Sequence, residues 1–354
     1  MKLAIMTMQS QNFGNRLQNY ALQEVLRDMG HDAESLRRDS GIHGDLSSKY
    51  HTVKSRLGAF RHVSDRVGRF RAFDRERIAH SSCIASNEYV TPGLADRYDG
   101  FVIGSDQVWN PCVKASRWIA FLPDMPSAKK ISYAASFGVK ELDAEDVEPY
   151  REMLAKIPNI SVREDAGSQI VQSICGRAAS VVLDPTLLLA ANRWEAIEVP
   201  PVNIEGAVGK NGYCFKYFLG TDAENRMIAS MAHERGLNLV DAMDPELAIG
   251  PAEFIWLIHH ASLVCTDSFH GSVFSLMFHI PLVVFNRKDQ YEDMSSRFDT
   301  LDRQFGIAER TFGSEAFRDD AAEHFDAAIF ESKREVLRAE SIAWLQKSLE
   351  DIAL

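Results

Sequence analysis

The stretch Leu263–Phe285, LVCTDSFHGSVFSLMFHIPLVVF, contains one complete strand–helix–strand pattern. Its apolar runs at 263–266 and 281–285 predict buried strands, and the periodic apolar residues of 272–278 predict a helix between them. Two strands joined by a helix form a parallel pair with a right-handed crossover. The stretch therefore predicts an α/β fold, in which His270 and Gly271 lie where the first strand gives way to the helix.

The same alternation of apolar runs and helical patterns extends over most of the chain. Many runs are continuous rather than alternating, which favours parallel strands covered on both faces. A stretch marked by glycine and proline, 200–211, separates the first six runs from the last four. The expected strands are Lys2–Met8, Asp32–Leu36, Gly100–Gly104, Lys130–Ser136, Ile160–Arg163, Ser180–Leu183, Tyr213–Phe218, Asn238–Ala242, Leu263–Thr266 and Pro281–Phe285.

Two such series predict two Rossmann-like lobes with parallel sheets that face each other across a cleft. We expect an N-terminal lobe at 1–200 with a basic helical insertion at about 40–82, and a C-terminal lobe at 205–330. Residues 331–354 have an amphipathic pattern, which predicts a terminal helix that packs back on the body.

Composition is that of an ordinary globular protein, with 45% hydrophobic and 25% charged residues. The net charge of −11 argues against nucleic acid as a partner. No apolar run reaches the roughly 18 residues that span a bilayer, and the N-terminal apolar run fits a first strand better than a signal peptide. Five scattered cysteines predict a reducing compartment without disulfides or structural zinc. We therefore expect a cytoplasmic protein.

One segment is basic. Between Lys49 and Arg77, nine Lys/Arg residues stand against three acids, a local balance of +6. The apolar residues interleaved with these charges resemble those of an interfacial helix: Leu57, Phe60, Phe70 and Phe73. This pattern predicts peripheral association with the inner face of the membrane, with a solvated basic face as the alternative.

Polar residues follow several of the expected strands. A helix begins near Asn15 and Arg16, directly after the first strand, where free amide groups could hold an anion. The alternative is a simple capped turn. There is no GxGxxG, so a dinucleotide fingerprint is missing. Asp106, Gln107 and Asn110 follow the strand at 100–104 and could reach a ligand, or could cap the turn that follows.

Arg163 ends another buried strand, where its guanidinium could clamp a phosphate or carboxylate through two parallel hydrogen bonds. The alternative is an ion pair with Glu164 or Asp165. Asp184 precedes a proline turn, and we interpret it as structural.

His270 is the one histidine at a strand-to-helix junction, where it can change charge near neutral pH beside Ser268 and Ser272. A turn-capping histidine is the alternative. The sequence has no P-loop, no Gly-x-Ser-x-Gly, no HExxH and no clustered metal ligands, so we predict no metal site.

Taken in order, the motifs resemble the polysaccharide pyruvyl transferase family. The matching segments are NFGNRLQNYALQ (12–23), YDGFVIGSDQVWNP (98–111), KISYAASFG (130–138), SVRE (161–164), VVLDPTLLL (181–189) and DSFHGSVFSLMFHIPLVVF (267–285). The resemblance implies a GT-B-like two-lobed fold, no cofactor, and transfer of pyruvate from phosphoenolpyruvate to two hydroxyls of a glycan acceptor, lipid-linked or free. The products are a cyclic ketal and phosphate.

The resemblance also implies roles for the residues described above. It assigns His270 and Asp106 as catalytic; Arg163, Asn15, Arg16, Ser268, Gly271 and Ser272 as donor-binding; and Gln107 and Asn110 as acceptor-binding.

The sequence departs from the family pattern at the histidine motif. Members of the family tend to carry Arg-x-His, whereas the triplet 268–270 here reads Ser-Phe-His. Either Arg16, Arg287 or Arg297 replaces the missing cation, or this branch uses another donor.

Two other functions fit the same pattern. A GT-B glycosyltransferase with a nucleotide-sugar donor would need an acid for the ribose, and Asp241 or Asp244 could serve. A non-catalytic protein that binds sugar phosphates is the second alternative.

Overall fold

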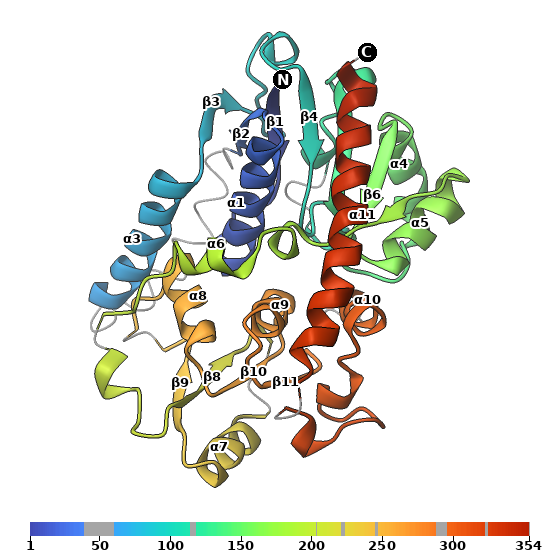
Figure 1. Ribbon diagram of the computed structural model, residues 1–354. Helices are drawn as coiled ribbons and strands as arrows, with labels where there is room; N and C mark the ends of the chain where they lie inside the picture. The colour runs from blue at the N-terminus through green and yellow to red at the C-terminus, as the bar shows by residue number, and fades with distance from the viewer. Residues whose placement is uncertain are drawn as a thin grey trace. The chain divides into compact units, whose positions relative to one another are not determined.

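The computed structural model describes residues 1–38, 60–113, 118–202, 204–220, 224–244, 247–287, 296–322 and 325–353 (Figure 1). The chain forms two compact units. Unit 1 contains the described residues of Met1–Arg56, Asp74–Leu188 and Val336–Leu354, and unit 2 those of Leu57–Phe73 and Leu189–Glu335. The chain passes from unit 1 to unit 2 at Leu188–Leu189, before the expected end of the N-terminal lobe at residue 200, and the described residues 60–73 of the expected N-terminal insertion belong to unit 2.

Unit 1 is built on a seven-stranded sheet in the order β3-β2-β1-β4-β5-β6-β7, and every pair in it is parallel. The strand order reverses at β1, because β2 lies on one side of it and β4 on the other. Such a switch point is where open α/β sheets bind ligands. The strands are β1 (Lys2–Met6), β2 (Asp32–Arg37), β3 (His80–Ile84), β4 (Gly100–Ile103), β5 (Lys130–Ala135), β6 (Asn159–Val162) and β7 (Ser180–Val181).

Helix α1 (Phe13–Asp28) follows β1, as the sequence predicts. Asn12 is its N-cap and accepts a hydrogen bond from the Asn15 amide at 3.4 Å. Its apolar residues, such as Leu17 and Leu22, are fully buried. The other helices of this unit are α4 (Ala144–Leu154), α5 (Asp165–Cys175) and the C-terminal part of α11 (Ala327–Ala353).

The expected basic insertion at 40–82 needs a correction. Residues 39–59 lie outside the described part of the chain, and α3 spans Phe60–Arg77. The following residues, however, form edge strand β3 (His80–Ile84), which pairs with β2. The sequence HSSCI has three polar residues followed by two apolar ones, so its residue types do not alternate although its burial does, and they give no strand signal.

Unit 2 contains a four-stranded parallel sheet in the order β11-β10-β8-β9. Aromatic residues fill its core, and Trp194 and Phe274 pack edge to face with ring centroids 4.9 Å apart. The strands are β8 (Tyr213–Tyr217), β9 (Asn238–Asp241), β10 (Leu263–Thr266) and β11 (Leu282–Val284). The α-helices that lie wholly within the unit are α6 (Ala191–Glu195), α7 (Asn225–Glu234), α8 (Pro251–His259), α9 (Phe269–Met277) and α10 (Ser296–Phe305). The predicted α/β class with two parallel sheets is confirmed.

Helix α11, red in Figure 1, begins at Ala327, four residues before the expected start, and continues to Ala353. Its C-terminal part packs on unit 1: the Ser341 hydroxyl accepts a hydrogen bond from the Leu183 amide at 3.0 Å, and the rings of Trp344 and Tyr133 are 6.3 Å apart. Among the described residues, no helix is both long and apolar enough to cross a membrane.

Candidate functional site

The carboxyl edge of the unit 1 sheet carries a buried ion-pair network. Arg163, directly after β6, donates to Asp184 at 2.7 Å and to Asp106 at 3.2 Å through its two terminal nitrogens. All three residues are less than 5% exposed. Burial opposes the charge of Arg163, but the carboxylates around it, led by Asp106, outweigh burial and raise the pKa of the guanidinium. Arg163 therefore bonds Asp106 and Asp184, and the charge of its neighbour Glu164 also raises its pKa.

Asn15 joins this network from α1. Its amide nitrogen donates to Asp106, and its amide oxygen accepts from the Ser10 hydroxyl. The side chain that was expected to contact the donor thus connects the first turn of α1 to the end of β4. Arg16 points elsewhere, because its Nε forms an ion pair of 2.6 Å with Asp74 of α3.

Glu164 organises the loop after β5, a role that the sequence analysis missed. Its Oε1 accepts hydrogen bonds from the Ser136 hydroxyl and from the amides of Phe137 and Gly138, at 2.8–3.1 Å. An acid next to an arginine suggested a local ion pair, so only the fold could reveal its bonds to residues 26–28 positions away.

The two expected acceptor-binding residues lie against this loop. A Cβ atom at Gly138 would lie 2.1 Å from Nε2 of Gln107 and 2.9 Å from Nδ2 of Asn110, so both amides pack directly on the glycine. Asn110 also caps the following turn, since its Oδ1 accepts from the Cys112 amide at 2.8 Å. Nε2 of Gln107 is buried and makes no hydrogen bond to any described part of the chain. Gln107 therefore keeps a donor available for a ligand.

The carboxyl edge of the unit 2 sheet is formed around the start of α9. This helix begins at Phe269, three residues earlier than expected, so His270 and Gly271 belong to its first turn rather than to a preceding loop. Ser268 is the N-cap and accepts from the Gly271 amide at 3.3 Å. Because Ser268 caps the helix, α9 begins before the periodic apolar residues do, which explains the difference.

Three of the expected donor-binding residues have roles inside this turn. The Ser272 hydroxyl donates to the Ser268 carbonyl at 3.1 Å. A Cβ at Gly271 would lie 2.7 Å from Oγ1 of Thr266, so the glycine allows α9 to approach β10. His270 is 6% exposed, and its ring packs edge to face with Phe269 at 5.4 Å. It is the titratable side chain of this turn.

Asp267 stabilises the same edge, although the sequence analysis did not single it out. Its two carboxylate oxygens accept from the amides of Leu219 and Gly220, at 2.7 and 2.8 Å, and so connect the end of β10 to the end of β8. Burial raises the pKa of Asp267, against the effect of these hydrogen bonds and of the nearby Arg287.

Two arginines named as substitutes for the missing cation belong to this unit. Arg287 follows β11, which pairs in parallel with β10, so both strands deliver their following residues to the same edge. Arg297 is buried in the first turn of α10, next to Phe298, whose ring lies 6.4 Å from that of Phe269.

A family model described as polysaccharide pyruvyl transferase matches residues 12–289, more than three quarters of the chain. The chain belongs to the polysaccharide pyruvyl transferase family. The predicted family is thereby confirmed. Among curated proteins, none matches the sequence.

Solved structures resemble the chain only distantly. The UDP-GlcNAc 2-epimerase from Neisseria meningitidis bound to UDP-GlcNAc has 10% identity and a TM-score of 0.49, with 99% of each chain covered. The Anabaena protein HepE in complex with UDP and glucose has 11% identity and a TM-score of 0.42, over 96% of this chain and 100% of that one. The spinosyn rhamnosyltransferase SpnG has 13% identity and a TM-score of 0.38, over 99% and 96%. Because these scores lie below 0.5, the fold class rests on the strand order itself.

The motifs within the matched range lie at the carboxyl edges of the two sheets. The segments that end β4, β5 and β6, together with the start of α1, supply the network of unit 1, while the DSFHG segment supplies the start of α9. The expected site residues thus belong to two separate groups: Asn15, Asp106 and Arg163 bond one another, whereas Ser268, Gly271 and Ser272 lie with His270 in unit 2. Arg16 instead forms its ion pair with Asp74 of α3.

Part of the basic segment also departs from expectation. Phe70 and Phe73 are 2% and 5% exposed, so these aromatic side chains cannot insert into a membrane as an interfacial helix would. Arg66 donates to the Ala242 carbonyl at 3.2 Å, and Arg69 forms a 3.2 Å ion pair with buried Glu253. Leu57 and the side chain of Phe60 lie outside the described residues.

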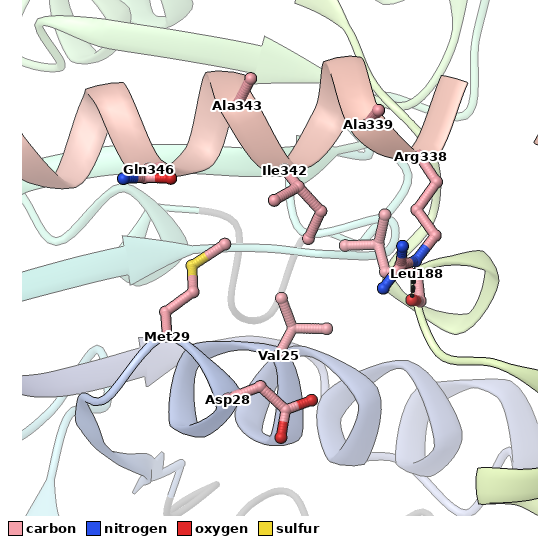
Figure 2. Close-up of a pocket in the computed structure, with 9 residues that line it drawn as sticks. All are labelled: Val25, Asp28, Met29, Leu188, Arg338, Ala339, Ile342, Ala343 and Gln346. Atoms are coloured by element: carbon pink, nitrogen blue, oxygen red, sulfur yellow. Dashed lines mark hydrogen bonds between the residues drawn. The ribbon is translucent and has the colours of Figure 1, made fainter. Parts of the chain in front are cut away.

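A pocket of about 460 Å³ lies between α1 and α11, and Figure 2 shows its lining. Val25 and Met29 line one side and Ile342 the other, and Arg338 donates to the Leu188 carbonyl at 2.6 Å. Val25 is ten residues beyond Asn15, which places it about 15 Å further along α1. The pocket is therefore separate from the polar network at the start of that helix.

Proposed function

We propose that this protein transfers pyruvate from phosphoenolpyruvate to a glycan acceptor as a cyclic ketal and releases inorganic phosphate. The observation that carries the proposal is the family match over residues 12–289, which includes the segment around His270. The buried, titratable histidine in the first turn of α9 is the group that this chemistry needs.

In the proposed reaction, His270 donates a proton to the methylene carbon of phosphoenolpyruvate. The double bond becomes a methyl group, and positive charge develops on the carbon that carries the phosphate oxygen. One sugar hydroxyl adds to that carbon and loses its proton. A second hydroxyl then displaces phosphate and closes the ring, so one proton is consumed, two hydroxyl protons are released and one phosphate leaves. A positioned general acid typically contributes about 10²–10⁴-fold to the rate.

The donor carries a phosphate and a carboxylate, which require cations. We place Arg287 in this role, because it follows β11 at the edge that contains His270 and its charge already acts on Asp267. Arg297 is the second candidate. Arg163, in contrast, bonds two carboxylates, and we now propose it as a positioning residue that fixes Asp106 and Asp184.

The acceptor would bind at unit 1. Gln107 offers its buried amide nitrogen as a donor to a sugar hydroxyl, with Asn110 beside it on Gly138. Asp106 would act through Asn15 and the loop around Gln107, because its carboxylate is shared between Asn15 and Arg163.

A nucleotide-sugar glycosyltransferase is the alternative activity, and the structure gives it little support. Asp241, a candidate for binding the ribose, forms an ion pair with buried Lys216 at 2.9 Å and accepts from the Met243 amide at 2.8 Å. Asp244 is half-buried after β9 and remains the candidate for that role.

The decisive experiment measures phosphate release from phosphoenolpyruvate with a panel of lipid-linked and nucleotide-linked sugars. Turnover with at least one acceptor supports the proposal. Thermal-shift measurements with phosphoenolpyruvate and with nucleoside diphosphates separate the two activities, since the true donor raises the melting temperature. Stabilisation by phosphoenolpyruvate without turnover on any acceptor would favour the non-catalytic alternative.

We further propose that exposed arginines of α3 attract an anionic acceptor at a membrane surface. With Phe70 and Phe73 buried, the attraction would be electrostatic, through Arg71 and Arg75. The double variant Arg71→Glu/Arg75→Glu should bind anionic liposomes more weakly, with stability changed by less than about 0.5 kcal/mol. Equal sedimentation of both proteins with the liposomes would remove the membrane from the proposal.

A further inference from the structure

Two adjacent histidines and a glutamate from a distant part of the chain meet on unit 2. His259 is the last residue of α8 and His260 is its C-cap, while Glu198 follows α6. The Nδ1 atom of His259 lies 2.9 Å from Oε2 of Glu198, and Nε2 of His260 lies 3.1 Å from Oε1 of the same carboxylate. One ligand atom from each residue lies within 4.8 Å of the others. Among the described residues, this is the group with the composition of a metal site.

Aromatic packing fixes both imidazole rings. The His260 ring stacks on Trp256, with centroids 4.5 Å apart and an interplanar angle of 27°. The His259 ring stacks on Phe278 at 4.4 Å and 21°. Rings that are held by neighbours lose little rotational freedom when they bind an ion, so the ligands are preorganised.

The spacing suits a small first-row ion. Nitrogen ligands lie about 2.0–2.1 Å from Zn²⁺, so two ligands of a tetrahedral ion are about 3.3 Å apart. The two observed nitrogen–oxygen distances, 2.9 and 3.1 Å, are close to that separation. The two imidazoles favour a transition metal over Mg²⁺ or Ca²⁺, which prefer oxygen ligands.

We propose that Glu198, His259 and His260 bind one Zn²⁺ ion, with water as the fourth ligand. The ion replaces the hydrogen bonds between the imidazoles and the carboxylate and links the segment after α6 to the end of α8. Solvent can deliver it, because the side chains of His259 and His260 are 28% and 43% exposed, whereas that of Glu198 is 14% exposed. This site is independent of the proposed transferase activity.

The test uses the full chain, free of any affinity tag and stripped with a chelator. Zn²⁺ is titrated by calorimetry, and Co²⁺ is added separately because a tetrahedral site gives it strong visible absorption. We expect one ion per chain and a rise in melting temperature with Zn²⁺. Glu198→Gln and His260→Phe should each weaken binding at least about 100-fold, since even residues outside the ligand set can cost 10–100-fold. His260→Phe keeps a ring that can stack on Trp256.

His279→Gln is the matched control, because His279 also pairs with a glutamate, Glu331, at 3.2 Å, but the described residues place no second imidazole in that pair. This variant should bind Zn²⁺ like the parent protein. The proposal is overturned if the parent protein binds no Zn²⁺, or if Glu198→Gln and His260→Phe bind it as tightly as the parent. Binding lost only in His279→Gln would place the ion elsewhere and also contradict the proposal.

Discussion

The two sheet edges use charge in opposite ways. At the edge of unit 1, Arg163 forms ion pairs with Asp106 and Asp184, so its charge connects the ends of β6, β4 and β7. At the edge of unit 2, the first turn of α9 carries the buried imidazole of His270, which packs on the ring of Phe269. An arginine that follows a buried strand can thus stabilise the fold instead of binding a ligand.

The strongest test of this contrast is His270→Gln. If His270 supplies the proton, kcat for phosphate release should fall by about 10²–10⁴-fold while the protein stays folded. His279→Gln, at a histidine beyond the other end of α9, is the control and should keep its activity. A melting temperature that falls while turnover per folded molecule is retained would assign His270 to the turn instead.

Arg163→Ala tests the other side of the contrast. Two buried carboxylates would lose their shared cation, and loss of one member of a buried ion pair typically costs about 3–5 kcal/mol of unfolding free energy. Urea denaturation should show this loss. Arg163→Lys keeps the charge but not the two-pronged guanidinium, so its unfolding free energy should lie between those of the parent protein and Arg163→Ala. Unchanged stability with weaker binding of phosphoenolpyruvate would identify Arg163 as a donor clamp after all.

Arg287→Ala should affect the donor rather than the scaffold. Loss of one charge-assisted contact costs roughly 1.5–3 kcal/mol, so KM for phosphoenolpyruvate should rise about tenfold to a hundredfold. Steady-state kinetics measure the effect, and Arg310→Ala, at another arginine of unit 2, serves as the comparison. If KM changes only in Arg297→Ala, the cation is supplied by α10.

The smallest expected effect concerns Asp267. Burial raises the pKa of Asp267 above its ordinary value of 3.8. Between pH 3.8 and the raised pKa, the folded protein therefore holds the proton more tightly than the unfolded chain does. The unfolding free energy should therefore decrease as pH rises from 3.8 through the raised pKa. Asp267→Asn should remove that part of the slope in urea titrations at a series of pH values. Parallel pH profiles for the two proteins would contradict the assignment.

Much of this fold could be predicted from the sequence, because continuous apolar runs report burial on both faces of a strand. All ten expected strands are present, whereas edge strand β3 was missed because its short, mostly polar sequence resembles a loop. The start of α9 was placed late, since the capping role of Ser268 overrides the apolar pattern.

The site was less predictable than the fold. The sequence indicates which polar residues follow strands, and parallel strands bring those residues to one edge. It does not indicate which of them bond each other: Asp184, interpreted as structural, is 21 residues from Arg163 and completes its ion pairs. The long-range bonds of Glu164 and Asp267 likewise depend on which strands are neighbours.

The division of the chain between the units has a consequence for how the protein folds. Unit 1 receives its final segment, Val336–Leu354, only after all of unit 2 has been synthesised. Until then, Tyr133 and the Leu183 amide lack their contacts with Trp344 and Ser341 of this helix. A nascent chain would therefore expose an unfinished N-terminal unit for as long as synthesis of the next unit takes, and chaperones would find their binding surface there.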